Sequence, residues 1–519
     1  MRKHKWIRKA MARRFIVALL LIAQFALLLL FIASSTAASK WIPVFLSAIS
    51  ICVGIYVINE RGKPGFKMTW LFTVLMFPVF GGLLYLFATR QASGTYVRKR
   101  LKKARAETTG RFEAEGRFEA DGELLAEATH AYPACATQQR YLQSFAGFPI
   151  CKNTAATYYP SGESFYAALL DELQCAEHYI FLEFFIIEEG IMWNSILDIL
   201  RQKAAEGLDV RLMFDDMGCF LTLPKEYPQY LESLGIKCKV FSPFVPVLSV
   251  LQNNRDHRKI ASIDGKVAFT GGANLADEYI NAYDKHGRWR DAAIRLVGDG
   301  AWNLTLIFLE LWRFASGTDE DCLAFRPEQV TPLPSAEPGA YVQPYADNPL
   351  DTENVSEHVY MQIIQNAQDY VYISTPYLII DDTIISALTL AAKSGVDVRI
   401  LTPQRWDKRL VHITTRSYYR DLIKAGVKIY EYKDGFNHAK TFVSDDRVAT
   451  VGTVNLDYRS LYLHYECGVA LYGGSVVSAV RDDFLNVLSE CVPITPEACA
   501  VSTPKRIFQD ILRIFAPLM

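Results

Sequence analysis

The alternation of apolar and polar positions divides the chain into an apolar N-terminal part and a longer part with strand and helix signals. Three apolar stretches come first, at 15–33, 41–58 and 69–89, and Pro78 and Gly81–Gly82 interrupt the third. About 20 consecutive apolar residues span a bilayer core, whereas the apolar region of a signal peptide is roughly 7–15 residues long. We therefore predict an integral membrane protein with N-terminal transmembrane helices. The alternative is a signal peptide cleaved near SSTAAS.

Basic residues flank the apolar stretches on both sides. The N-terminal segment 1–14 and the segment 98–105 are rich in Lys and Arg. Positively charged flanks stay on the cytoplasmic side, so both ends are predicted inside, which requires an even number of crossings. Three full crossings break this rule. Either the third stretch is re-entrant, or the first lies along the membrane interface, or the following domain lies outside.

The part of the chain beyond the connector at 90–140 predicts alternating strands and helices. The run EHYIFLEFFII (177–187) is typical of a buried strand, SILDILRQKAAEGLD (195–209) has helical periodicity and a stop at Gly207, and VRLMFDD (210–216) predicts the next strand. A strand, a helix and a strand of these lengths indicate a βαβ unit in a parallel or mixed sheet.

The same order of elements returns later in the chain. Strand, helix and strand signals recur at 368–380, 385–397 and 398–403, and a proline-rich bridge at 325–344 separates the two sets. Duplication over so long a period indicates two similar domains rather than a solenoid. The sequence therefore predicts an α/β fold.

The predicted borders place a first α/β domain at 141–330 and a second at 345–519. The tail 504–519 is short, basic and amphipathic. Such a segment either lies at a membrane interface or caps the second domain.

Each predicted domain carries one short motif. In the first, NNRDHRKIASIDG contains His257-x-Lys259, then Asp264 after four further residues, and a glycine turn that ends at Asn274 follows. A single histidine on a strand-like run is usually structural, since motif matches carry a real false-positive risk. The second domain changes that interpretation.

The second copy repeats the residue types and the spacing. FNHAKTFVSDDRVATVGTVN contains His438-x-Lys440, Asp445 and, after a glycine turn, Asn455. Side chains alternate between the faces of a strand, so each His and Lys shares a face and each Asp points the other way. Asp445 and its counterpart therefore belong to the motif but are predicted to anchor a turn or neighbouring backbone.

These paired HxK(x)4D elements, each followed by a glycine turn and Asn, resemble the phospholipase D superfamily. The stretches GGANLADEY, TPYLIIDD, GFNHAKT and VGTVNLDYRS resemble bacterial cardiolipin synthases more specifically. The resemblance covers roughly residues 41–519. It implies two phospholipase D-like domains packed with pseudo-twofold symmetry around one active site. The apolar stretch at 15–33 is a departure, because the family pattern has two spans.

Two histidines facing one cleft suit the cleavage of a phosphodiester. One imidazole attacks phosphorus to form a phosphohistidine, and the other protonates the departing alcohol and then deprotonates the acceptor. The symmetric motif leaves the choice of nucleophile open, and the resemblance favours His257. The two lysines and two asparagines can hold the non-bridging oxygens. Asp291 and Glu466 stand in matching places after the motifs, and the resemblance assigns them the orientation of the imidazoles.

Composition limits the cellular compartments and the binding partners that we expect for this protein. The formal net charge is −1, which disfavours a nuclease, and ten cysteines without a paired pattern indicate reduced thiols and a cytosolic soluble part. The sequence contains no cluster of residues with metal-ligand spacing, so we expect that the protein needs no metal and no cofactor. The chain is predicted to reside in a bacterial cytoplasmic membrane.

The resemblance implies transfer of a phosphatidyl group between two phosphatidylglycerol molecules, giving cardiolipin and glycerol. Phosphatidylglycerol, other anionic phospholipids and the bilayer are the expected partners, without nucleic acid; the oligomeric state stays open. Alternatives are a hydrolase or a transferase that uses another alcohol, and a membrane scaffold without catalysis. A scaffold predicts decay of one motif, and both motifs are intact.

Overall fold

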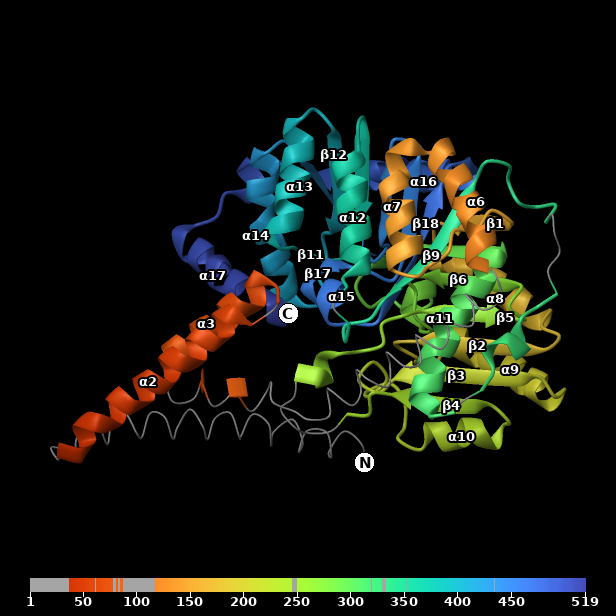
Figure 1. The fold of residues 1–519 in the computed structure, drawn as a ribbon, viewed down its shortest axis with the longest axis horizontal. Helices are drawn as coiled ribbons and strands as arrows, with labels where there is room; N and C mark the ends of the chain where they lie inside the picture. Colours follow the sequence, from red (N-terminus) through yellow and green to blue (C-terminus); the bar gives the residue numbers. More distant parts are fainter. Residues whose placement is uncertain are drawn as a thin grey trace. The chain divides into compact units, whose positions relative to one another are not determined.

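The computed structural model describes residues 37–60, 62–77, 81–82, 85–86, 117–244, 250–318, 320–328, 333–351, 353–433 and 435–519. The chain forms two compact units (Figure 1). One comprises Met1–Tyr96, Phe244–Asn253 and Asp510–Met519, and the other comprises Val97–Pro243 and Asn254–Gln509.

In the first unit, helix α2 (Ala37–Asn59) contacts helix α3 (Pro64–Met76). Val53 and Val57 of α2 are buried against Val74 of α3 and against Tyr85. The C-terminal turn η8 (Ala516–Leu518) also contacts α3. This unit is therefore a helical pair to which the end of the chain returns.

The predicted membrane segments fall on this unit only in part. The stretch 15–33 lies outside the described residues, 41–58 is helical within α2, and 69–89 is described only in part. Of the helices that the structure describes, none is long and apolar enough to cross a membrane. The transmembrane helices therefore stay a prediction.

The second unit contains two halves that repeat one order of elements. The first half contains α6 (Arg117–Ala131), α7 (Ala136–Arg140), β1 (Thr154–Tyr159), α8 (Gly162–Gln174), β2 (Tyr179–Phe184), α9 (Ile191–Ala205), β3 (Asp209–Asp215), α10 (Tyr227–Ser233), β4 (Lys237–Phe241), β5 (Ile260–Ile263), β6 (Val267–Gly271), β7 (Arg288–Arg290), β8 (Ala293–Gly298) and α11 (Asp299–Ser316).

The second half contains β9 (Tyr341–Asp347), α12 (Val355–Asn366), β10 (Tyr370–Ser374), β11 (Leu378–Ile379), α13 (Asp382–Lys393), β12 (Asp397–Pro403), α14 (Arg409–Lys424), β13 (Lys428–Tyr432), β14 (Gly435–Asn437), β15 (Thr441–Ser444), β16 (Val448–Gly452), β17 (Leu456–Asp457), α15 (Tyr458–Tyr462), β18 (Glu466–Tyr472), α16 (Gly474–Val487) and β19 (Cys491–Pro493). Helix α17 (Thr503–Ile514) follows, and its last residues belong to the first unit.

The two large sheets have the same topology. The first has the order β1-β8-β6-β5-β2-β3-β4, and the second has the order β9-β18-β16-β15-β10-β12-β13 with β19 added beyond β13. In the first sheet, neighbouring strands from β1 to β2 are antiparallel, and β2, β3 and β4 are parallel. In the second sheet, neighbouring strands from β9 to β10 are antiparallel, and β10, β12 and β13 are parallel. The predicted α/β fold with two similar domains is confirmed.

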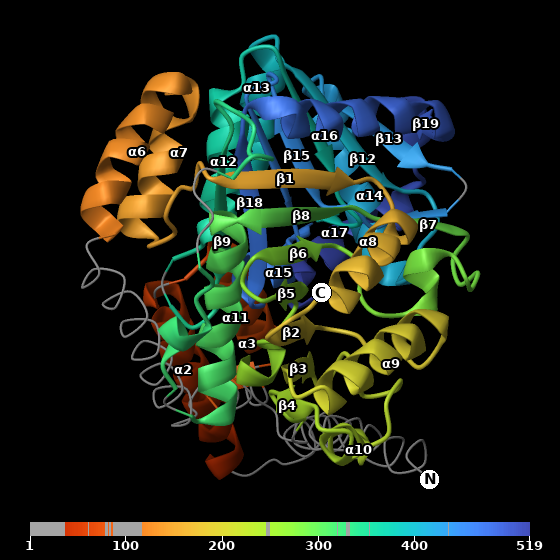
Figure 2. The same ribbon diagram turned by 90° about the vertical axis from the view of Figure 1, so that its right-hand side faces the viewer.

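Helices cover both faces of the first sheet. Helices α8 and α9 lie on one face and α11 lies on the other (Figure 2). Helix α11 contacts β4, β5, β6 and β8 of its own sheet and also β9 of the second sheet, and α16 makes the corresponding contact with β1. The two halves therefore pack together through equivalent helices and edge strands.

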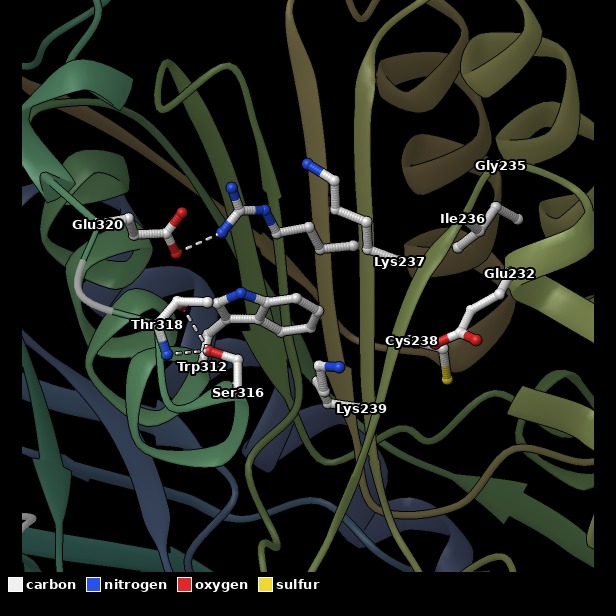
Figure 3. A pocket seen from close by; sticks show the side chains of 11 residues that line it. Glu232, Gly235, Ile236, Lys237, Cys238, Lys239, Trp312, Ser316, Thr318 and Glu320 are labelled. Atoms are coloured by element: carbon white, nitrogen blue, oxygen red, sulfur yellow. Dashed lines mark hydrogen bonds and ion pairs between the residues drawn. The ribbon is translucent and has the colours of Figure 1, made fainter. Parts of the chain in front are cut away.

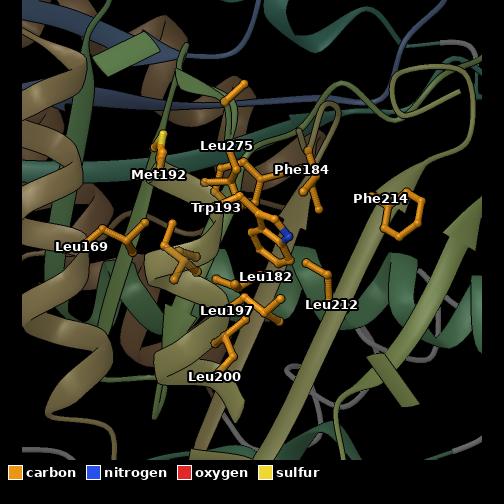
Figure 4. Packing of buried hydrophobic residues seen from close by; sticks show 14 of the residues in the cluster. Leu169, Leu182, Phe184, Met192, Trp193, Leu197, Leu200, Leu212, Phe214 and Leu275 are labelled. Atoms are coloured by element: carbon orange, nitrogen blue, oxygen red, sulfur yellow. The ribbon is translucent and has the colours of Figure 1, made fainter. Parts of the chain in front are cut away.

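The core of the first half lies between its sheet and helices α8 and α9 (Figure 4). Leu182, Leu212, Trp193 and Leu200 are completely buried there. Each such apolar side chain contributes roughly 1.5–3 kcal/mol when it leaves water. This packing holds β2 beside β5, the strand between Lys259 and Asp264 of the first motif.

Outside the two motifs, the predicted elements agree with the observed ones within a few residues, with one exception. Helix α9 ends at Ala205, and Gly207 follows with a φ of 96°, as expected of a helix stop. The exception is β9, which begins inside the predicted proline-rich bridge. Pro344 lies in this strand opposite Val469. Proline is tolerated there because β9 is the edge strand of its sheet.

Candidate active site

The two motifs lie at the boundary between the halves, where the backbone of each half bonds to the other. Strand β5 begins only at Ile260, so His257 and Lys259 precede it and do not lie on it as the sequence predicted. The backbone there bonds to the other half instead: the amide of His257 donates to the carbonyl of Tyr465 at 2.9 Å, and the amide of His438 donates to that of Arg290 at 2.7 Å. These bridges bring both motifs to the boundary between the halves.

Each histidine is paired with a carboxylate of the opposite half. His257 Nδ1 lies 2.9 Å from Oε1 and 3.0 Å from Oε2 of Glu466. His438 Nδ1 lies 2.7 Å from Oδ2 of Asp291. All four side chains are buried. The structure therefore brings the four predicted residues together as two exchanged pairs.

The carboxylates are themselves held in place. Thr453 donates its hydroxyl to Oε2 of Glu466. In the first half Gly272 stands at the corresponding position, and a Cβ there would lie 1.9 Å from Oδ1 of Asp291. That oxygen also accepts the amide of Ala292 at 2.8 Å. The Thr453 hydroxyl therefore fixes Glu466, and the absence of a side chain at Gly272 leaves room for Asp291.

This pairing determines the tautomer of the imidazoles. A carboxylate next to Nδ1 makes that nitrogen the proton donor and leaves the lone pair on Nε2. Lys440 Nζ also lies 2.9 Å from Nδ1 of His438. One nitrogen cannot donate to Asp291 and accept from Lys440 at once. We assign the proton by the carboxylate, because bonds with an ionised acceptor are the stronger ones.

The lysines of the motifs are buried beside the histidines. Lys259 donates to the carbonyl of His257 at 2.7 Å, and Lys440 makes the same bond to the carbonyl of His438. Burial lowers the pKa of Lys259 to about 8 and that of Lys440 to about 7, against the opposing effect of the nearby carboxylates. The ammonium groups of both lysines are thus held beside the histidines and away from solvent.

Burial also lowers the pKa of the imidazoles. The pKa of His438 falls to about 4, first because of burial and second because of the Lys440 charge. The pKa of His257 is lowered well below its usual value, first by burial and second by the charge of Lys259. Both rings are therefore neutral before an anionic ligand enters.

The rings around the two histidines differ. Trp289 and Tyr279 pack against His438, with centroid distances of 5.3 Å and 5.5 Å. His257 instead packs against Phe185 at 5.1 Å and against a third histidine, His464, at 5.5 Å. Sequence reasoning missed His464. The only available signal was its position two residues before Glu466, where Trp289 precedes Asp291 by the same interval.

The motif aspartates do not contact the imidazoles. Asp264 accepts hydrogen bonds from the backbone amides of Glu177, His178 and Tyr179, each at 2.8 Å. Asp445 accepts the equivalent three bonds from 368–370 at 2.8–2.9 Å. Each aspartate sits in a turn with a positive φ, and each carboxylate ties that turn to the start of β2 or β10.

The two motif asparagines are placed differently. Asn274 accepts from the amide of Ile186 at 3.0 Å and donates to the hydroxyl of Tyr279 at 2.6 Å, so its amide already has partners within the first half. Asn455 is buried, and its Oδ1 has no hydrogen-bond partner in the described part of the chain. The predicted contact with phosphate oxygens stays a prediction for both.

A buried cluster of charged groups lies just before the first motif. Glu183 and Asp256 are completely buried, and Arg258 Nη1 lies 4.0 Å from Glu183. Burial raises the pKa of Glu183 well above its usual value, and the neighbouring Asp256 raises it further. Sequence reasoning did not find this cluster, because Glu183 lies within an otherwise apolar strand.

One cavity of about 450 Å³ opens elsewhere in the first half and contains no residue of either motif (Figure 3). Its wall includes Trp312 and Arg211, which also forms ion pairs with Asp209 and Glu320. The second half repeats the arginine–aspartate pair with Arg399. The repetition indicates a structural role for this arginine, so the exchanged histidine pairs remain the candidate active site.

Comparison with known proteins adds to this geometry. The family described as "Cardiolipin synthase, PLD-like domain" matches residues 169–284 and 360–488, and the family "Phospholipase_D-nuclease N-terminal" matches 43–90. The first of these matches contains both motifs.

Individual proteins match over most of the chain. A cardiolipin synthase of a Geobacillus species is 33% identical over 92% of this chain and 94% of its own length. An uncharacterized protein of Streptococcus mutans serotype c is 42% identical over 90% of this chain and 99% of its own. The crystal structure of a phosphatidylserine synthase from Haemophilus influenzae Rd KW20 covers 74% of this chain and 100% of that chain, with a TM-score of 0.54 and 14% identity.

The solved structure shares the fold. The identity and the mutual coverage of the Geobacillus protein establish kinship in sequence. The chain belongs to the cardiolipin synthase family of the phospholipase D superfamily and is a phosphatidyltransferase-type enzyme.

Proposed function

We propose that this protein transfers a phosphatidyl group from one phosphatidylglycerol to a second, forming cardiolipin and releasing glycerol. The observation that carries the proposal is the pair of buried histidines, each held by a carboxylate of the opposite half at 2.7–3.0 Å. Two relatives, from a Geobacillus species and from Geobacillus thermodenitrificans, are named cardiolipin synthase and are each 33% identical to this chain.

The first step is attack on phosphorus. With the proton on Nδ1, His257 presents the lone pair of Nε2 to the phosphodiester of the donor lipid. The N–P bond forms as the bond to the glycerol oxygen breaks, and His438 gives its proton to that oxygen. Family resemblance favours His257 as the nucleophile. Lys259 and Lys440 stabilise the negative charge that develops on the phosphoryl oxygens.

His438 must carry a proton for this step. Its pKa is about 4 in the buried site, so the ring is neutral in the free enzyme. The negative charge of a bound phosphodiester raises the pKa of a neighbouring imidazole, and the Asp291 carboxylate stabilises the imidazolium that results. Substrate binding therefore favours the protonated form of His438, which acts as the acid in the first step.

The second step restores the enzyme. The neutral His438 removes the proton from the terminal hydroxyl of a second phosphatidylglycerol, the oxygen attacks phosphorus, and the N–P bond breaks. The products are cardiolipin and free His257. We further propose that the protein acts at the membrane through its N-terminal segments, because donor and acceptor are both lipids.

The test is product analysis with purified full-length protein in mixed micelles that contain labelled phosphatidylglycerol as the sole lipid. Cardiolipin and glycerol in equal amounts are expected. Phosphatidic acid without cardiolipin would show that water is the acceptor and would refute the transferase. Absence of turnover, with activity only after another alcohol is added, would assign a different acceptor.

A further inference from the structure

His464 is a buried histidine that the proposed transfer does not use. It lies immediately before β18, between the Tyr465 backbone that bonds to the first motif and the end of α15. Only 9% of its surface is exposed, and its Nδ1 has no hydrogen-bond partner in the described part of the chain. A buried ring nitrogen without a hydrogen-bond partner calls for a chemical explanation.

Two other residues with potential metal-ligand atoms, His257 and Glu466, lie near this ring. Nδ1 of His464 lies 3.7 Å from Oε1 of Glu466, which is too long for a normal hydrogen bond. The same oxygen lies 2.9 Å from Nδ1 of His257. Oε2 accepts the Thr453 hydroxyl and also lies 3.0 Å from His257 Nδ1, whereas Oε1 lies near both histidine rings. One ligand atom from each of the three residues lies within 4.8 Å of the others.

These distances fit a tetrahedral zinc ion. With bonds of about 2.0–2.1 Å, the ligand atoms of such a site are about 3.3–3.4 Å apart, which lies between the two observed separations. Two histidines and one glutamate form a ligand set that zinc uses in proteins and that leaves a fourth position for water. The sequence predicted no metal site, because His257 and the other two ligands lie far apart in the chain.

The first half supplies an internal comparison. His438 and Asp291 repeat the histidine–carboxylate pair, but Trp289 stands where His464 stands in the second half. An indole has no lone pair to offer a metal, since its nitrogen is only a donor. The third ligand therefore exists at one of the two pairs, and a metal would distinguish between them.

We propose that His257, His464 and Glu466 form a zinc-binding site whose occupation reversibly inhibits the enzyme. Zinc would replace the proton on Nδ1 of His257, release that proton to solvent and break the bond between His257 and Glu466. The ion withdraws electron density from the ring, so Nε2 loses nucleophilicity. The positive charges of Lys259 and Lys440 oppose a cation, and the site therefore binds zinc more weakly than a structural zinc site does.

Binding is tested first, without reference to turnover. Full-length protein freed of metal by a chelator is titrated with zinc, and the bound equivalents are measured by equilibrium dialysis. The wild type is expected to bind one equivalent more than His464→Asn, whereas the control variant His412→Asn, changed on α14, keeps that equivalent. Equal zinc binding by the wild type and His464→Asn would overturn the proposal.

Cobalt identifies the ligands. The site contains no sulfur ligand, so the cobalt spectrum that His464→Asn loses is expected to lack thiolate charge-transfer bands. Thiolate bands in that difference spectrum would assign the metal to the cysteines and overturn the proposal.

Inhibition rests on the proposed function and is measured separately. Each variant is compared with its own zinc-free rate, and His464→Asn is expected to need roughly tenfold more zinc or higher for half inhibition. Zinc bound at His464 without any slowing of lipid turnover would refute the inhibition. If no phosphatidyl transfer occurs under any condition, the proposed function fails, and the dialysis experiment still decides the metal site.

Discussion

His257 of the first half is hydrogen-bonded through Nδ1 to Glu466 of the second half at 2.9 Å, across 209 positions of sequence. His438 and Asp291 make the reciprocal pair at 2.7 Å. Neither half therefore contains a complete histidine–carboxylate pair. The site exists only when the two halves dock, and α11 and α16 contribute to this docking because each contacts the opposite sheet.

The carboxylate partners should be needed for chemistry rather than for folding. Asp291→Asn and Glu466→Gln keep the shape of the side chain but cease to favour the proton on Nδ1. We expect each to lower the rate of cardiolipin formation by about 10² to 10⁴, as in other enzymes with an oriented imidazole. Initial rates with phosphatidylglycerol measure this. Glu177→Gln, on an exposed side chain, is the matched control, and a rate within about threefold of wild type for either site variant would contradict the pairing.

Gly272 should be intolerant of a methyl group. An added Cβ would lie 1.9 Å from the Oδ1 of Asp291, so Gly272→Ala must displace the carboxylate from His438. We expect a fall in activity comparable with that of Asp291→Asn, at an unchanged elution volume in gel filtration. Gly122→Ala is the control, because a Cβ there meets nothing within 4 Å. Full activity of Gly272→Ala would mean that the position of Asp291 is not required.

The motif aspartates should affect stability, and to different degrees. Asp264 binds three backbone amides in a buried or half-buried setting, whereas two of the three amides that Asp445 binds are exposed. Water can replace the acceptor only at the exposed amides. We expect Asp264→Ala to lower the free energy of unfolding by roughly 3 kcal/mol and Asp445→Ala by less. Thermal melts of the two variants test this order, and the reverse order would contradict it.

Glu183 should make stability depend on pH. Its pKa is raised in the folded state by burial and by Asp256, so the stability it contributes is complete below the unfolded pKa and is lost as pH rises through the folded value. Glu183→Gln cannot ionise. The melting temperature of this variant relative to wild type should therefore increase as pH is raised from about 5 to about 9. Glu177→Gln should show no such trend, and a flat difference for Glu183→Gln would contradict the raised pKa.

The repeated local patterns made much of the fold predictable. Apolar runs and helical periodicity located β2, α9 and β3 to within a few residues, and the recurrence of these patterns predicted the second half. Strand β9 was missed because Pro344 is typical of a loop, and only its place at the sheet edge makes it a strand residue. Edge position is a property of the whole sheet and leaves no mark on the local sequence.

The residues of the candidate site were predictable, but the pairing of each histidine with its carboxylate was not. The residue types and spacing identified His257 and His438, and the family resemblance pointed to Asp291 and Glu466, yet neither says which carboxylate serves which ring. That choice follows from how the two halves dock. His464 had no signal beyond its place two residues before Glu466, and only the folded structure shows that its ring lies 5.5 Å from that of His257.

A covalent phosphohistidine on His257 is the central claim, and rapid quenching into alkali tests it most directly. Enzyme mixed with phosphatidylglycerol labelled at phosphorus is quenched during turnover, digested and mapped. We expect label that survives alkali, is lost in acid and resides on the peptide containing His257, with none in His257→Asn. Equal label in His257→Asn, or label confined to the peptide containing His438, would contradict it.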